Sequence, residues 1–229
     1  MDERSDGRRL RLACQAVLFD LDGVLADSKA VVERTWRAWA KRHDVAAEAI
    51  LAIAHGQRSV DTIRAVAPHL PAEAEAAALD DREATDTEGI VPVAGAPELL
   101  ASLPRHAVAV VTSANLRLAT GRLAAAGLAP PDVIITAEQV TLGKPDPDGY
   151  LRAADRLGVD PGRCVVFEDA PIGIQAALYA RIPVVAVTTT HPADALAGAV
   201  AFVDDLRSVR PIVADGRLQG LILVASKLR

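Results

Sequence analysis

Two aspartates stand two residues apart near the start of the chain, directly after a short apolar run. The run Ala16–Phe19 is followed by Asp20 and Asp22. Gly23 then lets the chain turn away at once. Two carboxylates fixed in this way can bind a divalent cation, and one of them can attack phosphorus. The alternative is an ordinary acidic turn, because Asp and Gly are frequent turn residues.

Hydroxyl and amino groups end two further segments. Thr112 and Ser113 follow a second apolar run, where the Thr112 hydroxyl and the Ser113 N–H could donate to a phosphate at the N-terminus of a helix. Asn115 is a good cap for that helix. Lys144 lies in the turn-rich segment 141–147, and a lone lysine in such a place is usually a solvated charge.

A fourth segment again ends in acids. Glu168 and Asp169 follow the apolar run Cys164–Phe167. Two adjacent acids repel each other unless a cation or a basic group is near. Acids at two strand ends, with a hydroxyl and a lysine at two others, form one self-consistent site. In that site the acids hold Mg²⁺, while Thr112 and Lys144 hold phosphate oxygens.

Short apolar runs that alternate with helical patterns position these residues. This order predicts an α/β fold whose core is a doubly wound, parallel, Rossmann-like sheet with right-handed crossovers. Open sheets of this kind bind ligands in the crevice beyond the carboxyl ends of their strands. The predicted strands are Ala16–Phe19, Ala107–Val111, Val133–Ile135, Cys164–Phe167, Val184–Val187 and Val200–Val203, and the predicted helices are Leu116–Ala126, Gly149–Leu157 and Ile172–Ala180.

The segment from about residue 28 to residue 91 breaks the alternation. It has no β-rich run, Trp36 and Trp39 recur at helical spacing, and Ala72–Ala84 is rich in the strong helix formers Ala and Glu. We expect the two tryptophans in the core of a small all-helical domain, with hinges near 26–29 and 90–95. The predicted domains are an α/β core formed by residues 13–28 and 92–229, and a helical insertion formed by residues 29–91.

The end of the chain gives weaker signals. Ala214–Arg217 predicts a turn, and Leu221–Ala225 could be a strand.

Composition limits the classes of function. The 229 residues carry a formal net charge of -5 and only 3% aromatic side chains, so neither a basic footprint nor stacking platforms for nucleic acid are present. No secretory or membrane-spanning segment is recognisable, and residues 1–11 are charged and polar. Cys14 and Cys164 border apolar runs and indicate small core residues. We expect a soluble protein of the reducing cytoplasm without nucleic-acid or membrane partners.

Four motifs in order, DLDGVLADS, VVTSAN, GKPDP and FEDAPIG, resemble those of the haloacid dehalogenase-like (HAD) phosphohydrolase superfamily over nearly the whole chain. The helical insertion resembles the cap domain that members of the superfamily carry between their first and second motifs. Within it, the chain is most similar to small sugar-phosphate and polyol-phosphate phosphatases. His55, Gly56 and Arg58 lie in a segment that resembles the loop by which such caps recognise their substrates.

The resemblance implies a role for each matched residue. Asp20 would be the nucleophile that forms an aspartyl-phosphate. Asp22 would be the general acid for the leaving alkoxide, and then the general base for water. Thr112, the Ser113 N–H and Lys144 would bind the phosphoryl group in transit.

The resemblance also implies the metal. The carboxylates of Asp20 and Asp169 and the backbone carbonyl of Asp22 would bind Mg²⁺, with Glu168 next to these ligands. Hard oxygen ligands suit this ion. Phosphoryl transfer is mostly positioning and charge neutralisation, which two acids, a metal and a lysine supply.

The preferred prediction is a Mg²⁺-dependent phosphatase that hydrolyses a small phosphorylated sugar or polyol, as a monomer or weak homodimer. One alternative is an isomerase similar to β-phosphoglucomutase, which would return the phosphoryl group to its substrate. Another is a receiver-type signalling domain, which also places acids, a hydroxyl and a lysine at strand tips but lacks the second aspartate and a large helical insertion. The substrate itself is not readable from one sequence.

Overall fold

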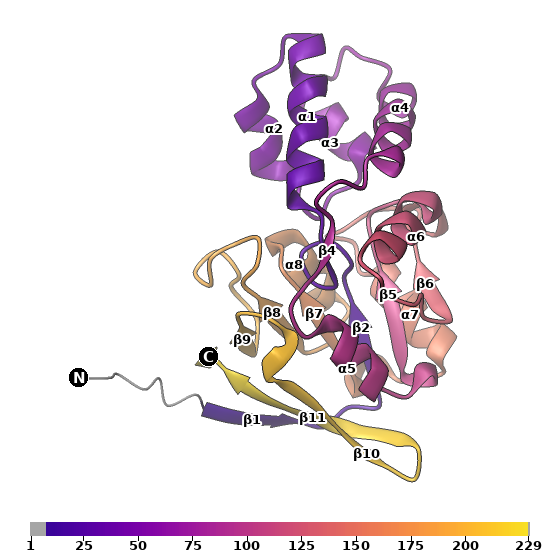
Figure 1. Ribbon diagram of the computed structural model, residues 1–229, viewed down its shortest axis with the longest axis vertical. Coiled ribbons are helices and arrows are strands. Elements are labelled where there is room, and N and C mark those ends of the chain that lie inside the picture. The colour runs from indigo at the N-terminus through magenta and orange to yellow at the C-terminus, as the bar shows by residue number, and fades with distance from the viewer. Residues whose placement is uncertain (1–7, 229) are drawn as a thin grey trace, which may run out of the picture.

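The computed structural model describes residues 8–228 and is built around one seven-stranded sheet (Figure 1). Six neighbouring strands run parallel, and only the last strand of the chain is antiparallel to its neighbour. From one edge to the other the strands are β12 (Lys227–Leu228), β9 (Ala201–Val203), β8 (Val184–Val187), β7 (Cys164–Glu168), β2 (Ala16–Phe19), β5 (Val108–Val111) and β6 (Val133–Ile135). The first strand after the N-terminal segment, β2, therefore lies at the centre, between β5 and β7.

Helices cover both faces of this sheet. Side chains alternate between the faces along each strand, so Val17 and Phe19 pack on one side and Ala16 and Leu18 on the other. Apart from Glu168 at the end of β7, these strands are apolar, as strands with both faces buried must be. The helices are α5 (Ala96–Ser102) and α6 (Leu116–Ala125) on the face of Phe19, and α7 (Asp148–Leu157) and α8 (Pro171–Tyr179) on the face of Leu18. The predicted doubly wound α/β class is confirmed.

The helical insertion, called the cap below, stands over the carboxyl edge of the sheet (Figure 1). The segments that lead into and out of it, β3 (Ala26–Asp27) and β4 (Val91–Pro92), pair as antiparallel strands. Its helices are α1 (Lys29–His43), α2 (Ala47–Ala54), α3 (Ser59–Val66) and α4 (Ala72–Thr85). The assignment of residues 29–91 as a separate domain remains a prediction.

The cap has its own apolar core, as the spacing of the tryptophans predicted. Trp36 and Trp39 are both buried, and their rings meet edge to face with centroids 5.7 Å apart. The Trp39 indole N–H donates to Glu75 Oε2 at 2.9 Å, so its polar atom is satisfied at the rim of this core. The cap core shares no buried residue with the clusters on the sheet.

A second, three-stranded sheet closes the end of the core away from the cap. Its strands, in order, are β1 (Arg8–Leu12), β11 (Arg217–Ala225) and β10 (Val209–Ala214), all antiparallel. The predicted turn at Ala214–Arg217 joins β10 to β11, with Asp215 and Gly216 both at positive φ. Strands β1 and β10 were not predicted, because the charged residues of β1 indicated a polar terminal segment and Pro211 in β10 argues against a strand.

Within residues 8–228, no helix has the length and the apolar character that crossing a bilayer requires.

Candidate active site

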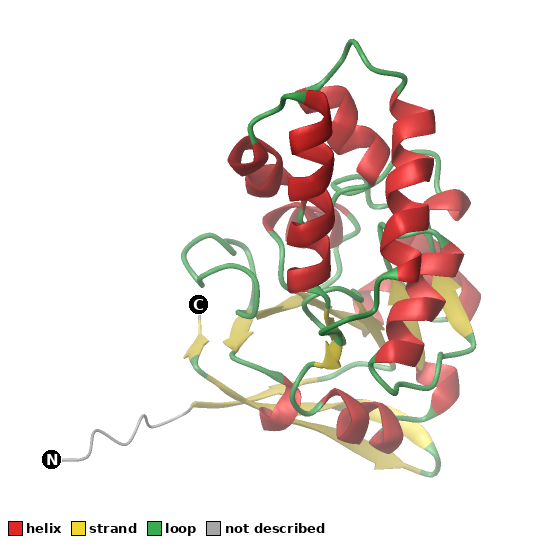
Figure 2. Ribbon diagram, turned by 45° about the horizontal axis from the view of Figure 1, so that its top comes forward, coloured by secondary structure: helices red, strands yellow, loops and turns green. Residues whose placement is uncertain are grey.

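The carboxyl ends of the central strands face the cap (Figure 2). Side chains of both line a cleft between them. This is the edge at which open α/β sheets bind ligands. The core wall of the cleft carries Asp20, Asp22, Thr112, Ser113, Arg122 and Asp169, and the cap wall carries Lys29, His55, Gly56, Gln57, Ser59, Asp80 and Glu83.

Asp20 is held rigidly at the end of β2. Its backbone N–H donates to the carbonyl of Phe167 in β7 at 3.0 Å, so Asp20 continues the sheet. Lys144 Nζ donates to Asp20 Oδ1 at 2.8 Å. No other hydrogen bond to this carboxylate is found among residues 8–228, which leaves Oδ2 available at the cleft.

Lys144 lies between two carboxylates and is buried with them. Its Nζ also donates to Glu168 Oε1, at 2.5 Å. Burial alone would lower the pKa of the Lys144 ammonium, but the charges of Asp20 and Glu168 outweigh it and raise that pKa. Lys144 is therefore a permanent positive charge beside Asp20. In sequence it resembled a solvated lysine, because its two partners are 124 and 24 residues away.

Glu168 orients this lysine, since both of its carboxylate oxygens are occupied. Besides Lys144, Oε1 accepts from the Tyr150 hydroxyl at 2.8 Å. Oε2 accepts the backbone N–H groups of Asp169 at 3.0 Å and Ala170 at 3.2 Å. The side chain is fully buried and saturated with donors. Glu168 thus lies next to the other acids as predicted, and its bonds suit a supporting position better than that of a metal ligand.

The acids at the ends of β2 and β7 form a cluster that suits a divalent cation. Asp20, Glu168 and Asp169 offer oxygens that all lie within 4.8 Å of one another. Burial and the neighbouring carboxylates raise the pKa values of Asp20 and Asp169, and Lys144 offsets this only in part. Lys144 pairs with two of the three carboxyl groups, so their negative charge is only partly balanced. With Glu168 saturated, Asp20 and Asp169 are the carboxylates open to a hard cation such as Mg²⁺.

Gly23 explains how the loop after β2 approaches this cluster. It has a φ of +76°, and a Cβ built on it would lie 2.0 Å from Asp169 Oδ2. Only glycine fits such a close approach with this backbone. The turn that the sequence predicted at Gly23 therefore brings the loop against the acid at the end of β7.

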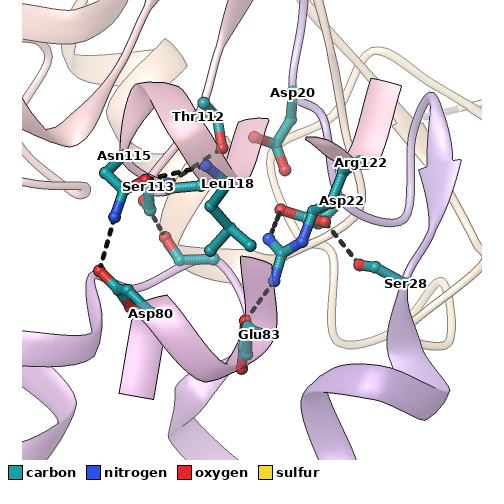
Figure 3. A network of polar contacts seen from close by, with 12 residues as sticks. Asp20, Asp22, Ser28, Asp80, Glu83, Thr112, Ser113, Asn115, Leu118 and Arg122 are labelled. Atoms are coloured by element: carbon teal, nitrogen blue, oxygen red, sulfur yellow. Dashed lines mark hydrogen bonds and ion pairs between the residues drawn. The ribbon is translucent and has the colours of Figure 1, made fainter. Parts of the chain in front are cut away.

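The Asp22 carboxylate lies between Ser28 and Arg122 (Figure 3). Its Oδ1 accepts from the Ser28 hydroxyl at 2.5 Å, and its Oδ2 accepts from Arg122 Nη1 at 2.5 Å. The other terminal nitrogen of Arg122 donates to Glu83 of α4. Burial raises the pKa of the Glu83 carboxyl to about 7, because the attraction of Arg122 offsets desolvation only in part.

The predicted phosphate-binding groups, the Thr112 hydroxyl and the Ser113 N–H, belong to the segment between β5 and α6 (Figure 3). Thr112 Oγ1 accepts the N–H of Ala114 at 3.1 Å, and the Ser113 hydroxyl donates to the carbonyl of Gly56 in the cap at 2.7 Å. Asn115 caps α6 by accepting the N–H of Leu118 at 2.9 Å. The structure thus brings Thr112 and Ser113 to the same cleft as Asp20, and Asn115 has the capping position that its sequence suggested.

The loop between α2 and α3 divides into two parts. His55 and Gly56 line the cleft. Arg58 does not line it: its Nε donates to Asp61 at 2.6 Å and its Nη1 to the carbonyl of Thr141 at 3.3 Å. The structure therefore brings two of the three predicted recognition residues to the cleft, and sets Arg58 against the segment that precedes Lys144.

Sequence reasoning missed three contributors to this site: Arg122, Glu83 and Tyr150. Arg122 and Glu83 lie inside helical patterns, where a charged residue normally faces solvent. One sequence signal for Arg122 exists. It lies on the same helix face as the apolar Leu118 and Ala119, at i+4 and i+3 from them, which indicates a buried side chain. Tyr150 lies on the buried face of α7. The sequence pattern does not indicate that its hydroxyl bonds to Glu168, 18 residues away.

A doubly wound sheet with an acid pair after its central strand, a buried lysine and a capped cleft defines a class of hydrolases. The chain belongs to the haloacid dehalogenase-like hydrolase family, whose model matches residues 14–181. The family prediction is confirmed, and a receiver domain is set aside.

Particular relatives are similar over most of their lengths. Hexitol phosphatase A of Escherichia coli K12 is 44% identical over 188 residues, covering 80% of this chain and 86% of that protein. Validoxylamine A 7'-phosphate phosphatase of Streptomyces hygroscopicus subsp. limoneus is 39% identical over 204 residues, covering 86% and 96%. The crystal structure of CbbY from Rhodobacter sphaeroides in complex with phosphate matches with a TM-score of 0.73 at 25% identity, covering 84% of this chain and 95% of that one.

Proposed function

We propose that this chain is a Mg²⁺-dependent phosphatase that hydrolyses a small sugar or polyol phosphate monoester through an aspartyl-phosphate on Asp20. The observation that carries the proposal is the buried, lysine-paired Asp20 carboxylate at the end of β2, with Asp22 on the same wall of the covered cleft. The names of the relatives, a hexitol phosphatase and a validoxylamine A 7'-phosphate phosphatase, support the substrate class.

In the first step, Asp20 Oδ2 attacks phosphorus and forms an acyl-phosphate bond while the bond from phosphorus to the leaving oxygen breaks. A proton from Asp22 goes to the leaving alkoxide, which departs as the free alcohol. Lys144, the Thr112 hydroxyl and the Ser113 N–H bind the equatorial phosphoryl oxygens. The Lys144 charge is fixed by Glu168, so it needs no rearrangement as negative charge shifts.

In the second step, water attacks phosphorus and the bond to Asp20 breaks, which regenerates its carboxylate. Asp22 takes the proton of the water, so each group returns to its starting state and inorganic phosphate is released. The cap excludes bulk water from the cleft in the first step, and some movement of the cap must admit the reacting water.

Mg²⁺ would be held by the Asp20 and Asp169 carboxylates and the Asp22 carbonyl, and would supply charge neutralisation for the phosphoryl oxygens. The excess of carboxylate over lysine at this edge supports that assignment. We also propose the cytoplasm as the compartment, which two free, buried cysteines suit.

A phosphate-release screen over hexose, hexitol, glycerol and nucleotide monophosphates tests the proposal, with Mg²⁺ and with excess chelator. We expect release from sugar or polyol phosphates, abolished by chelator and by Asp20→Asn. Conversion of β-glucose 1-phosphate to the 6-phosphate with little release would instead establish the isomerase. No turnover of any monoester would contradict both.

A further inference from the structure

We propose that Arg122 is a positioning residue for Asp22, and that Glu83 completes the arrangement from the cap, so that Asp22 is held in its working orientation only while the cap lies against the core. This inference rests on the proposed function, because it concerns the proton-transfer residue of that reaction.

Arg122 joins the two walls of the cleft. It comes from α6 of the core, and its side chain is only 6% exposed. Nη1 donates to Asp22 Oδ2 at 2.5 Å, and Nη2 donates to Glu83 of α4 in the cap (Figure 3). The planar guanidinium presents its donors in a rigid fork, so the place of one partner constrains the place of the other. The position of the cap is thereby transmitted to the Asp22 carboxylate.

The burial of this guanidinium makes both partners necessary. A buried cation is costly unless it is paired and hydrogen-bonded, and breaking one half of a buried pair costs more than a surface pair is worth. Arg122 Nε already has no partner among residues 8–228. If the cap moved away, Glu83 would leave, and Arg122 would keep Asp22 as its only carboxylate. The geometry seen here therefore belongs to the covered cleft.

The neighbouring pair Arg117–Asp81 provides a matched control. It joins the same two helices, α6 and α4, with Arg117 Nη1 and Asp81 Oδ1 2.5 Å apart. Both side chains are more than 60% exposed, and neither contacts Asp22. An exposed pair of this kind contributes little. If Arg122 only held the cap against the core, substitution of either arginine would affect activity in the same way, and only the size of the effect would differ.

The experiment compares kcat/KM for an alkyl substrate, sorbitol 6-phosphate, with kcat/KM for 4-nitrophenyl phosphate. For a reaction through a phosphoenzyme, this parameter contains only the steps up to departure of the leaving group. An alkoxide needs a proton from Asp22, whereas nitrophenolate hardly does. A defect that acts through Asp22 must therefore be larger on the alkyl substrate.

We expect Arg122→Gln to lower kcat/KM for sorbitol 6-phosphate by about 10- to 100-fold, and for 4-nitrophenyl phosphate by less than about threefold. In the Asp22→Asn background, Arg122→Gln should cost less than about twofold more, because the two residues act as a unit. Arg117→Gln should change either value by less than about twofold. Equal losses on both substrates, or full multiplication in the double variant, would overturn the inference.

Glu83→Gln tests the cap half and does not depend on Arg122→Gln folding. It keeps the size of the side chain and an acceptor for Arg122 but removes the charge. We expect Glu83→Gln to lower kcat/KM for sorbitol 6-phosphate by about 3- to 10-fold, and again to lower it less for 4-nitrophenyl phosphate. Equal losses on the two substrates in Glu83→Gln would overturn the role of the cap. If the native chain hydrolyses both probes and these patterns fail, the inference alone fails. If it hydrolyses no monoester of the phosphate-release screen, the proposed function fails and takes the inference with it.

Discussion

The two walls of the cleft are built in different ways. On the core side, Lys144 bonds directly to both Asp20 and Glu168, and these two acids stand at the ends of the parallel strands β2 and β7. On the cap wall, the side chains come from helix faces and one loop, and they reach the core mainly through single contacts such as Ser113 to Gly56. The core wall is a preformed binding surface, whereas the cap wall depends on where the cap lies.

This difference separates chemistry from recognition. Strand ends in a parallel sheet are fixed by a ladder of backbone hydrogen bonds, so groups placed there need no further ordering when substrate binds. A helical insertion on two short linkers can change its position, which suits substrate entry and product release. Changes to the core wall should therefore abolish turnover, and changes to the cap wall should alter which substrate is used.

The largest effect is expected from Asp20→Asn. The amide keeps the shape of the side chain but cannot form the acyl-phosphate, so kcat should fall on the order of 10⁴-fold or more, because phosphate monoesters barely react unaided. A hydroxylamine-sensitive phosphoenzyme should be trapped from the native chain and be absent from the variant. Asp27→Asn, at an exposed acid seven residues along the chain, is the control and should stay active. Turnover near the native rate in Asp20→Asn would show that Asp20 is not the nucleophile.

Asp169→Asn should have the next largest effect. Because Asp169 is one of two carboxylates open to the cation, we expect the Mg²⁺ concentration for half-maximal activity to rise by about 10- to 100-fold. The measurement is a Mg²⁺ titration of phosphate release after chelator treatment. Less repulsion among the buried acids would at the same time leave the variant as stable as the native chain, or more so. An unchanged Mg²⁺ requirement with a loss of stability would mark Asp169 as a purely structural acid.

The same contrast decides what the sequence could predict. Asp20, Asp22, Thr112 and Asp169 meet at one cleft because each comes soon after a recognisable strand, and parallel strands end at one edge; their roles stay predictions. Lys144 was assigned to the site only because the residues at those strand ends required a positive charge nearby. Its own segment carries no pattern that indicates this role.

The cap wall could not be predicted in this way. Helical spacing located the buried tryptophans, but which polar residues of α4 meet α6 depends on how two separately packed units touch. No periodicity within either helix contains that information, so Glu83 and Arg122 were missed. Arg58 was assigned to recognition from a loop pattern, and its pairing with Asp61 in the next helical turn competes with that role.

A smaller but measurable effect is expected from Gly173→Ala, behind the core wall. A Cβ on Gly173 would lie 1.7 Å from Glu168 Oε1, so the buried carboxylate that orients Lys144 must shift. We expect a loss of about 1–3 kcal/mol in the free energy of unfolding, measured by urea denaturation, together with a lower kcat. The matched control is Gly121→Ala in α6, where a Cβ meets nothing within 4 Å. That change should be neutral or stabilising by up to about 1 kcal/mol. Equal stability of the two variants would show that Glu168 is free to move.

The smallest effect is expected on the cap wall from Arg58→Ala, and it gives the sharpest test of the comparison. In the structure Arg58 is engaged by Asp61 and the Thr141 carbonyl, so its removal should cost only about 0–1 kcal/mol and raise KM for a sugar or polyol phosphate less than about fivefold. His55→Ala, which alters a side chain that lines the cleft, should raise the same KM more. KM for 4-nitrophenyl phosphate should change little in either variant, because that substrate has no hydroxyls for the cap to bind. If Arg58→Ala instead raises KM more than His55→Ala does, Arg58 must leave Asp61 and turn to the substrate during the cycle. The cap wall would then differ from the core wall in a stronger sense, as a surface whose binding groups are assembled only when substrate is present.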